Sequence, residues 1–574
     1  MNPPTQTNQS SREKLLALVA KMRAEKESSQ TGTTDVLSRT PTQEAINAQS
    51  KTLQVQPSEP TYWEILDKYG NLITLNSKQQ EFVKTASSGK ACVLIGAAGT
   101  GKTTCQRAVT QSLIQSGIAG ILEAEGHKHL FSGTPGIVIC AYTRRAVANI
   151  RRNMPADLQN NCITIHKLLE YQPVYYEVTD ESTGESKTTM KFEATRHAGN
   201  PLPSSIRVII FEESSMIGTD LHQEVINACP HNVQFIYLGD IQQLPPVFGP
   251  AILGFKLLEL PVVELTEVYR QALESPIISL AHRILSAKPL PLKEFDDWKK
   301  EGQMTIRGWK KKISPEEATI TLGAVFKQFH EKGLYDPEED IILIPFNKSC
   351  GTEELNRIIA NHLARHREET TWQIIAGFMK VHLSVGDRVL YEKEDAVVVK
   401  ITPNPSYAGV MPIRESKTLD YWGHDPVIHT KTEDDSDDAM DFLLAQTAAA
   451  EKEDRVKKSS HRVTVKLTDS EQEVTIDSAG DINSLLLGYA LTVHKAQGSE
   501  WRKVFFCLHQ SHATMVQREL LYTAVTRARE ELYIICEPES FVKGILSQRV
   551  KGNTLGEKAE YFKGKLDKQQ ELLS

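Results

Sequence analysis

The sequence lacks the features that mark membrane, secreted and fibrous proteins. No uninterrupted apolar run approaches the ~20 residues that cross a bilayer, and the polar segment from Met1 to Arg12 has no apolar stretch typical of signal peptides. The 8 cysteines form no C-x-x-C pair, and several lie inside apolar runs, as reduced core thiols do. The 33 glycines and 26 prolines among 574 residues exclude collagen-like and wholly disordered chains. We therefore expect an intracellular protein that is not inserted in a membrane.

An excess of basic residues is also missing. Lysine and arginine number 66 against 73 aspartates and glutamates, a net charge of -7, which argues against a surface coated with basic patches but is compatible with one basic groove. Hydrophobic residues make up 40% of the chain, enough for real cores. At roughly 100 to 200 residues per domain, the length predicts three or four domains.

The first 60 residues are rich in Gln, Ser, Thr and Pro, which predicts a mobile extension. Within it, the apolar residues from Glu13 to Lys26 fall roughly on one helical face. Such an amphipathic helix either folds back on the body of the protein or docks on a partner.

From Trp63 onward, short apolar runs alternate with segments of helical periodicity, which indicates parallel α/β layers. Two sets of strands predict two α/β domains, the first over residues 61–270 and the second over 271–380 and 483–574, the last part including a C-terminal helix. The predicted strands are Ala91–Ile95, Ile137–Tyr142, Val208–Phe211 and Phe235–Leu238, then Ile341–Pro345, Leu486–Leu491, Val504–Cys507 and Leu532–Cys536.

Two insertions interrupt this pattern. Val174–Val178 and Thr188–Glu193 predict a β-hairpin within about residues 172–200. Short strand-like runs over residues 381–482 predict a small β-barrel, and the acidic run Glu433–Asp438 inside it is either a solvated loop or a partner-binding segment.

A phosphate-binding motif directly follows the first predicted strand. Gly96-Ala-Ala-Gly99-Thr-Gly101-Lys102-Thr103 matches G-x-x-x-x-G-K-[ST], and a helical run begins at Thr104. The glycines let backbone N–H groups face phosphate oxygens, Lys102 reaches the β and γ phosphates, and the Thr103 hydroxyl ligates Mg²⁺. A plain glycine turn before a helix is the alternative. The context favours a nucleoside-triphosphate site.

Glu212 and Glu213 end the apolar run Val208–Phe211. A P-loop enzyme needs acidic groups at such a strand end, and we assign Glu213 to water activation and Glu212 to the outer shell of Mg²⁺. Two solvated acids are the alternative.

The third predicted strand ends in Gly239-Asp-Ile-Gln-Gln243-Leu-Pro-Pro-Val247. This segment resembles the third motif of superfamily 1 helicases of the RecD-like and Dda-like branch, in which the glutamine senses the γ-phosphate. Five further segments are similar to motifs of the same family in the same order: Leu75–Gln79, Thr164–Leu169, Glu267–Gln271, Tyr489–Glu500 and Tyr522–Ala528.

The resemblance implies roles for individual residues around ATP. Gln79 would read adenine, Glu500 would bond the ribose, and Arg270 and Arg527 would reach across the interdomain cleft to the charge on the transferring phosphoryl group. Glu212 stands where the family usually has aspartate, which could slow turnover because Mg²⁺ demands near-octahedral geometry. Tyr142 replaces a usual proline, and Val385–Val389 matches the usual G-D-R-V without the asparagine-glycine turn expected downstream.

The resemblance also implies a track for single-stranded DNA across both α/β domains. Residues expected on this track are Thr143, His166, Thr492 and His494, which suit contacts to the nucleic-acid backbone. Arg144 and Arg145 either add charge attraction or form a solvated pair. The hairpin resembles a strand-separating pin, and its aromatics are expected either to stack on bases or simply to pack within the hairpin: Tyr175, Tyr176 and Phe192.

The fold class we predict is therefore α/β, with two RecA-like parallel-sheet P-loop domains, an inserted β-hairpin and a small inserted β-barrel. The expected function is an ATP- and Mg²⁺-dependent DNA helicase that moves 5′ to 3′ on single-stranded and fork DNA, with an RNA helicase or a nucleotide-gated DNA-binding or loading module as alternatives. We expect a monomer, cytoplasmic, nucleoid-associated or viral, whose N-terminal extension or acidic insertion recruits a replication or repair protein.

Overall fold

The computed structural model describes most of the chain from Glu64 onward. The described residues are 64–66, 72–120, 134–179, 186–246, 250–268, 274–309, 313–391, 394–407, 458–468, 471–552 and 554–573. Three predicted features lie outside them: the helix at Glu13–Lys26, the acidic run Glu433–Asp438, and Arg270 with its neighbours.

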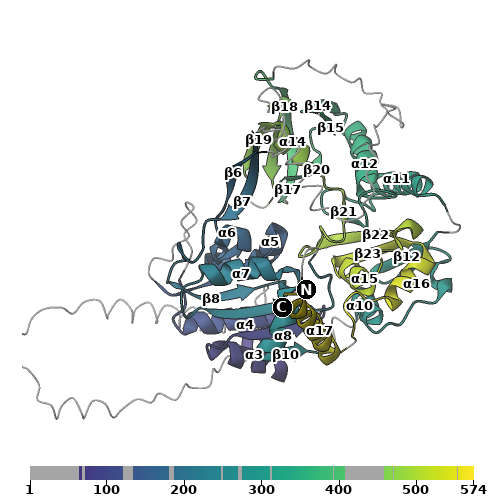
Figure 1. Ribbon diagram of the computed structural model, residues 1–574. Helices are drawn as coiled ribbons and strands as arrows, with labels where there is room; N and C mark the ends of the chain where they lie inside the picture. The colour runs from purple at the N-terminus through teal and green to yellow at the C-terminus, as the bar shows by residue number, and fades with distance from the viewer. Residues whose placement is uncertain are drawn as a thin grey trace, which may run out of the picture. The chain divides into compact units, whose positions relative to one another are not determined.

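The first α/β domain is built on a six-stranded sheet in which every pair is parallel, in the order β10-β3-β9-β8-β4-β5. Each of the four strands predicted here is present. The strands are β3 (Cys92–Gly96), β4 (Gly136–Ala141), β5 (Cys162–Thr164), β8 (Ile206–Phe211), β9 (Gln234–Gly239) and β10 (Val262–Leu265). The helices are α3 (Ser77–Ser87), α4 (Lys102–Gln115), α5 (Arg144–Asn153), α6 (Ile165–Leu168), α7 (Thr219–Ala228) and α8 (Ile252–Glu259) (Figure 1).

The continuous apolar strands of this sheet reflect burial of both faces. Along β3, Cys92 and Leu94 join one core cluster, whereas Val93 and Ile95 join another. A strand covered on both sides reads as an unbroken apolar run, since neither face meets water. This is why the pattern was readable from the sequence.

The second α/β domain contains another six-stranded sheet, in the order β11-β12-β23-β22-β13-β21, parallel except for the β11–β12 pair. Its strands are β11 (Lys299–Glu301), β12 (Met304–Gly308), β13 (Ile341–Ile344), β21 (Ala490–Thr492), β22 (Trp501–Leu508) and β23 (Ala528–Cys536). Its helices are α10 (Pro276–Leu285), α11 (Pro315–Glu331), α12 (Thr352–His366), α15 (Arg518–Val525) and α16 (Pro538–Leu546).

Between α12 and β21 the chain forms a seven-stranded antiparallel sheet around one core cluster. It begins at Trp372, earlier than the predicted boundary at 381. Its elements are β14 (Trp372–Ala376), β15 (Met379–Leu383), β16 (Arg388–Tyr391), β17 (Glu394–Pro403), β18 (Lys458–Leu467), β19 (Glu473–Ser478), α14 (Ala479–Ser484) and β20 (Leu486–Leu487).

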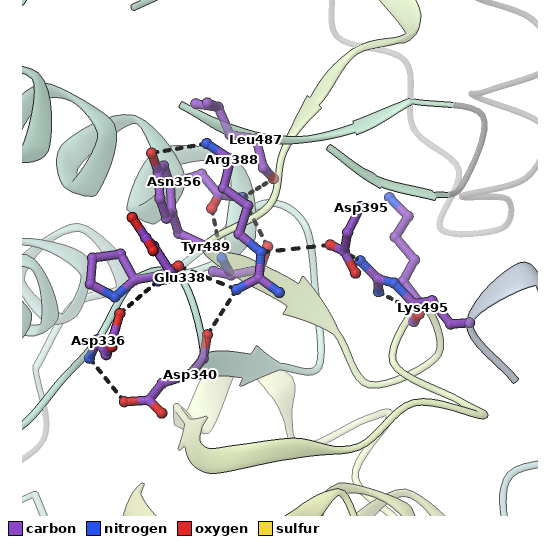
Figure 2. Close-up of polar contacts among 12 residues, drawn as sticks. Asp336, Glu338, Asp340, Asn356, Arg388, Asp395, Leu487, Tyr489 and Lys495 are labelled. Carbon is purple, nitrogen blue, oxygen red and sulfur yellow. Dashed lines mark hydrogen bonds and ion pairs between the residues drawn. The ribbon is translucent and has the colours of Figure 1, made fainter. Parts of the chain in front are cut away.

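The prediction of one strand over Leu486–Leu491 is wrong, because two sheets divide this segment. β20 pairs with β16 of the seven-stranded sheet, and β21 pairs with β13 of the second α/β sheet. The Asn356 side chain spans the break: its Nδ2 donates to the carbonyls of Leu487 at 3.0 Å and Ala490 at 2.9 Å, and its Oδ1 accepts from the Ala490 N–H at 2.7 Å. Figure 2 shows Asn356 beside Leu487 at this junction.

The predicted hairpin is present after α6. β6 (Tyr171–Thr179) pairs antiparallel with β7 (Ser186–Ala194). A second small pair, β1 (Glu64–Leu66) with β2 (Leu72–Thr74), precedes α3. Short 3₁₀ helices cover Ala156–Asn161, Ser214–Met216, Leu292–Phe295 and Gln510–His512.

The last helix, α17 (Leu555–Leu573), packs against α8 of the first α/β domain. Phe562 belongs to a core cluster of the first sheet and lies against Gly254 of α8, where an added Cβ would come within 2.5 Å of its ring. Figure 1 shows α17 beside α8. Among the described helices, none combines the length and apolar character needed to span a bilayer.

Candidate nucleotide site and nucleic-acid interface

The P-loop joins the end of β3 to the start of α4. Gly99 and Gly101 have φ of +79° and +88°, a conformation that side chains disfavour, and a Cβ on Gly96 would lie 2.3 Å from Thr100 Oγ1. Lys102 Nζ donates to the Gly96 carbonyl at 2.6 Å, which closes the loop. No side chain caps the first turn of α4 in the described structure, so its N–H groups face outward at the positive end of the helix. This geometry suits an anion such as a phosphate.

Glu212 and Glu213 follow β8, two positions from β3 in the sheet. Glu212 is 9% exposed, and burial raises the pKa of its carboxyl to about 7; the charge of Glu213 adds to this rise, and Lys102 opposes it. Glu213 adopts a left-handed backbone with φ of +48°, and its Oε2 is buried with no hydrogen-bond partner among the described residues. A carboxylate held in this way has capacity for a ligand.

Asp240 and Gln243 follow β9, the strand between β3 and β8. Asp240 is fully buried and accepts hydrogen bonds from the Gln242 N–H at 2.9 Å and from the Tyr522 hydroxyl at 2.6 Å. Gln243 is also buried, and within the described part of the chain its Oε1 has no partner. The amide of Gln243 is therefore available to a bound group.

Tyr522 of α15 connects the second α/β domain to the P-loop. Its hydroxyl donates to Asp240 and accepts the Ala98 N–H at 2.7 Å. Burial and the Asp240 charge raise the pKa of Tyr522 well above its ordinary value, so the hydroxyl stays protonated and can donate. One side chain thus joins the P-loop to the loop after β9.

Two further hydrogen bonds hold the same loop against the second domain. The Leu244 N–H donates to Thr523 Oγ1 at 3.0 Å, and Gln497 Nε2 donates to the Leu244 carbonyl at 2.7 Å. Arg527 is buried nearby, but its guanidinium donates to its own domain, at the Thr523 carbonyl (3.0 Å) and the Ser499 carbonyl (3.2 Å). Its predicted contact with a phosphoryl group would require these bonds to be exchanged.

The residues predicted to contact the base and the ribose, Gln79 and Glu500, belong to α3 and to the loop before β22. Gln79 is buried in the first turn of α3 and completes a capping box with Asn76: the Gln79 N–H donates to Asn76 Oδ1 at 2.9 Å, and the Asn76 N–H donates to Gln79 Oε1 at 3.0 Å. Glu500 is exposed just before β22. The structure gives Gln79 a helix-capping role that the motif alone did not indicate.

One predicted nucleic-acid contact of the first α/β domain, Thr143, lies against Gly498, which follows β21 of the second. The Asn149 side chain donates to the Gly498 carbonyl at 2.7 Å, and a Cβ on Gly498 would lie 3.1 Å from Thr143 Oγ1. Thr143 caps α5 by accepting the Ala146 N–H, and Thr492 is buried with its Oγ1 accepting the Lys495 N–H at 3.3 Å. Both hydroxyls therefore already stabilise local turns.

The remaining predicted contacts lie on or near the hairpin and in the loop after β21. The His166 ring contacts Tyr142 and Tyr171 edge-on, with centroids 5.6 and 5.0 Å apart. Phe192 is 54% exposed and pairs in register with Pro173 near the base of the hairpin, so it does not form the tip. Tyr175 and Tyr176 lie midway along β6, with side chains outside the described part, and His494 is half-buried.

Arg144 and Arg145 both form ion pairs with acids of the seven-stranded sheet, Arg145 as a buried residue and Arg144 with 44% of its side chain exposed. Arg145 forms an ion pair of 2.6 Å with Asp395, and Arg144 one of 3.0 Å with Glu394, both on β17. Burial tends to raise the pKa of Asp395, but Arg145 and Arg388 outweigh it and hold that pKa below its usual value. Figure 2 shows Arg388 reaching Asp395 on one side and the Asp340 carbonyl on the other, at 3.6 and 3.0 Å.

Comparisons with known proteins agree with this arrangement. Two families match the chain: an AAA domain over residues 79–249 and a UvrD-like helicase C-terminal domain over residues 487–535. The ATP-dependent RecD2 DNA helicase of Deinococcus radiodurans is 27% identical over 487 residues, 84% of this chain and 52% of that protein. The ATP-dependent DNA helicase Dda of Enterobacteria phage T4 is 24% identical over 474 residues, 77% of this chain and 93% of that protein.

The chain is similar to superfamily 1 helicases of the RecD-like and Dda-like branch. It spans about half the length of the Deinococcus relative. A crystal structure of Pif1 helicase from Candida albicans, 16% identical, aligns with 86% of this chain and 100% of that one at a TM-score of 0.40.

In this chain, sequence reasoning missed residues whose partners are distant along the chain. Tyr522 is part of the family-like segment Tyr522–Ala528, but its hydrogen bond to Asp240 joins residues 282 positions apart. Asn149 and Asp395 carried no local signal. Only the fold reveals that they connect the first α/β domain to its neighbours.

Proposed function

We propose that this protein is an ATP-dependent DNA helicase that translocates 5′ to 3′ on single-stranded DNA. The observation that carries the proposal is the convergence of four groups at the carboxyl ends of β3, β8 and β9: the P-loop, Glu213, Gln243 and the Tyr522 bridge from the second domain. In open parallel sheets, ligands bind at these strand ends. The names of the RecD2 and Dda relatives, both ATP-dependent DNA helicases, support the same function.

Each residue of the nucleotide site has a separate proposed role in phosphoryl transfer. Lys102 and the free N–H groups of α4 would hold the phosphates, Glu213 would orient and deprotonate water, and Gln243 would contact the γ-phosphate. Arg527, and Arg270 beyond the described residues, would stabilise charge on the transferring group. Because hydrolysis changes what Gln243 and Arg527 contact, the two domains would shift against each other in each cycle.

The residues also fit a magnesium ion. The Thr103 hydroxyl is exposed at the start of α4, and the Glu212 carboxylate is buried close enough to Lys102 for their charges to interact. Oxygen donors of this kind are those that Mg²⁺ prefers. Bound there, the ion would neutralise charge on the β and γ phosphates.

For DNA, Thr143, His166, Thr492 and His494 are proposed to contact the backbone, and the β6–β7 hairpin is proposed to separate strands. The meeting of Thr143 and Gly498 supports this, because a strand that crosses both domains would pass such a point. A change in domain spacing there would move the strand.

The test is ATP hydrolysis with and without single-stranded DNA over a range of salt, followed by unwinding of 5′-tailed and 3′-tailed duplexes. We expect stimulation that weakens as salt rises, since phosphate contacts release counterions, and unwinding of the 5′-tailed duplex. Unwinding of only the 3′-tailed duplex would refute the polarity. Stronger stimulation by RNA of equal length would favour an RNA helicase, and nucleotide-dependent DNA binding without stimulation would favour a loading module.

A further inference from the structure

Lys558 of α17 is a buried lysine whose ammonium lies beneath the loop that carries Gln243. It is 1% exposed, and its Nζ donates to Gln242 Oε1 at 2.6 Å and to the Ile241 carbonyl at 3.3 Å. Lysines are rarely buried to this extent, because removing the charge from water is costly unless it is paired. The two acceptors belong to the residues immediately before Gln243. The ammonium therefore binds the loop after β9.

The surroundings of the ammonium come from both α/β domains. Burial lowers the pKa of Lys558, while the nearby charges of Glu519 on α15 and Asp240 after β9 oppose that change. Arg518 adds to the lowering. The Lys558 ammonium therefore interacts electrostatically with acidic residues of both α/β domains.

The segment that leads to Lys558 is fastened to α15, the helix that carries Tyr522. The Glu519 carboxylate accepts the N–H groups of Arg549 at 3.1 Å and Val550 at 3.0 Å, and Arg518 Nε donates to the Ile545 carbonyl at 2.9 Å. We call residues 547–552 and 554–562 the strap. Its first part therefore follows the position of α15.

The second part of the strap is fixed to the first α/β domain. Besides Lys558, Phe562 lies on Gly254 of α8, where the absence of a side chain allows the ring to approach. The Phe562 and Phe255 ring centroids are 6.4 Å apart. The strap therefore connects α15 of one domain to the loop after β9 of the other, on a route separate from the Tyr522 bridge.

We propose that Lys558 is a positioning residue that holds residues 241 and 242 so that Gln243 faces the γ-phosphate, and that the strap links this position to α15. The inference rests on the proposed function and extends it to the last helix. Gln243 is next to Gln242. Loss of the Lys558 ammonium would therefore allow the backbone at residues 241 and 242 to move, and the Gln243 side-chain amide would move with it. The consequence is specific: recognition of the third phosphate suffers, whereas recognition of the first two does not.

The test compares Lys558→Met with Lys563→Met, an exposed lysine on the same helix. Binding of a fluorescent ADP and its displacement by ATPγS give two affinities for each variant. We expect Lys558→Met to keep the ADP affinity within about twofold and to lose about fivefold or more of the preference for ATPγS, with kcat for DNA-stimulated hydrolysis lower by about tenfold. Lys563→Met should match the parent protein.

A second variant tests the bond itself. Gln242→Leu removes the acceptor, so it should reproduce the lost preference, and the Lys558→Met/Gln242→Leu double variant should be little worse than either single variant, as expected for residues that act as one unit. Thermal unfolding of each variant is measured in parallel. Additive losses would overturn the proposed pairing.

The outcomes separate this inference from the proposed function. Equal weakening of ADP and ATPγS, or an unchanged preference in Lys558→Met, overturns the positioning role. If the parent protein shows no DNA-stimulated hydrolysis but Lys558→Met still loses its ATPγS preference, the positioning role stands and the helicase proposal fails.

Discussion

Replacing Glu212 by glutamine should stabilise the protein in the absence of nucleotide and magnesium. The carboxyl is buried, and its pKa rises from 4.5 to about 7 because of burial first and the Glu213 charge second. At roughly 1.4 kcal/mol per pH unit, that rise corresponds to about 3 kcal/mol of unfolding free energy lost when Glu212 is ionised. Glutamine has the same shape and no charge to bury.

The direction of the Glu212 pKa shift determines how the stability of the parent protein changes with pH. A carboxyl with a raised pKa in the folded protein binds its proton more tightly when folded, so the parent protein loses stability as pH rises from 4.5 to about 7. The advantage of Glu212→Gln should be absent below this interval, grow across it and stay constant above it. Thermal unfolding by circular dichroism at about pH 5 and about pH 8 measures the difference, and we expect a midpoint several degrees higher for the variant at the upper pH.

Glu264→Gln on β10 is the matched control, because Glu264 is an exposed acid on the same sheet and its replacement should change little at either pH. Adding ATP with Mg²⁺ should reverse the order of Glu212→Gln and the parent protein, since the carboxylate is proposed to help hold the ion. A variant no more stable than the parent at about pH 8 without magnesium would refute the buried-charge reasoning.

Three further predictions concern neighbouring groups. Lys102→Ala should abolish steady-state ATP hydrolysis, whereas Glu213→Gln should bind ATP and fail to turn it over; hydrolysis that survives Lys102→Ala would move the site elsewhere. Tyr522→Phe should lower the unfolding free energy by about 2 kcal/mol in urea titration, because the buried Asp240 carboxylate and the Ala98 N–H lose their shared partner; an unchanged midpoint would mean that water replaces the hydroxyl. Asp395→Asn should cost about 3 kcal/mol by leaving the buried Arg145 charge unpaired, whereas Asp477→Asn, which breaks a surface pair with Lys458, should cost under about 1 kcal/mol; equal costs would contradict the role assigned to burial.

Sequence patterns predicted those parts of the fold that depend on residues close together in the chain. The strands around β3 were readable because both faces are buried, and the P-loop was readable because its glycines are required by positive φ and close contact. The hairpin was also predicted, from two β-rich runs around a turn. In each case the residues that determine the structure are close together in the sequence.

The missed features depend on partners far along the chain. Leu486–Leu491 reads as one strand, but the break depends on pairing with two different sheets and on Asn356, on a helix over 100 residues earlier. Arg144 and Arg145 carry no sign of the acids on β17, 250 positions away. The docking of α17 on α8 likewise follows from the fit of Phe562 to Gly254, which no periodicity encodes. Tertiary contacts of this kind override any prediction from local sequence.

The division of Leu486–Leu491 between two sheets bears on how the seven-stranded sheet could be lost or exchanged between relatives. An inserted domain can be excised cleanly when its two ends lie side by side and its removal leaves the host intact. Here β20 and β21 are separated only by Gly488 and Tyr489, and the Tyr489 hydroxyl donates to Asp387 and accepts the Arg388 N–H at the start of β16 inside the insert. Cutting the insert out would therefore remove the anchor of an edge strand of its host, so deletion chimeras should misfold unless Tyr489, Asn356 and a substitute for Arg388 are retained together.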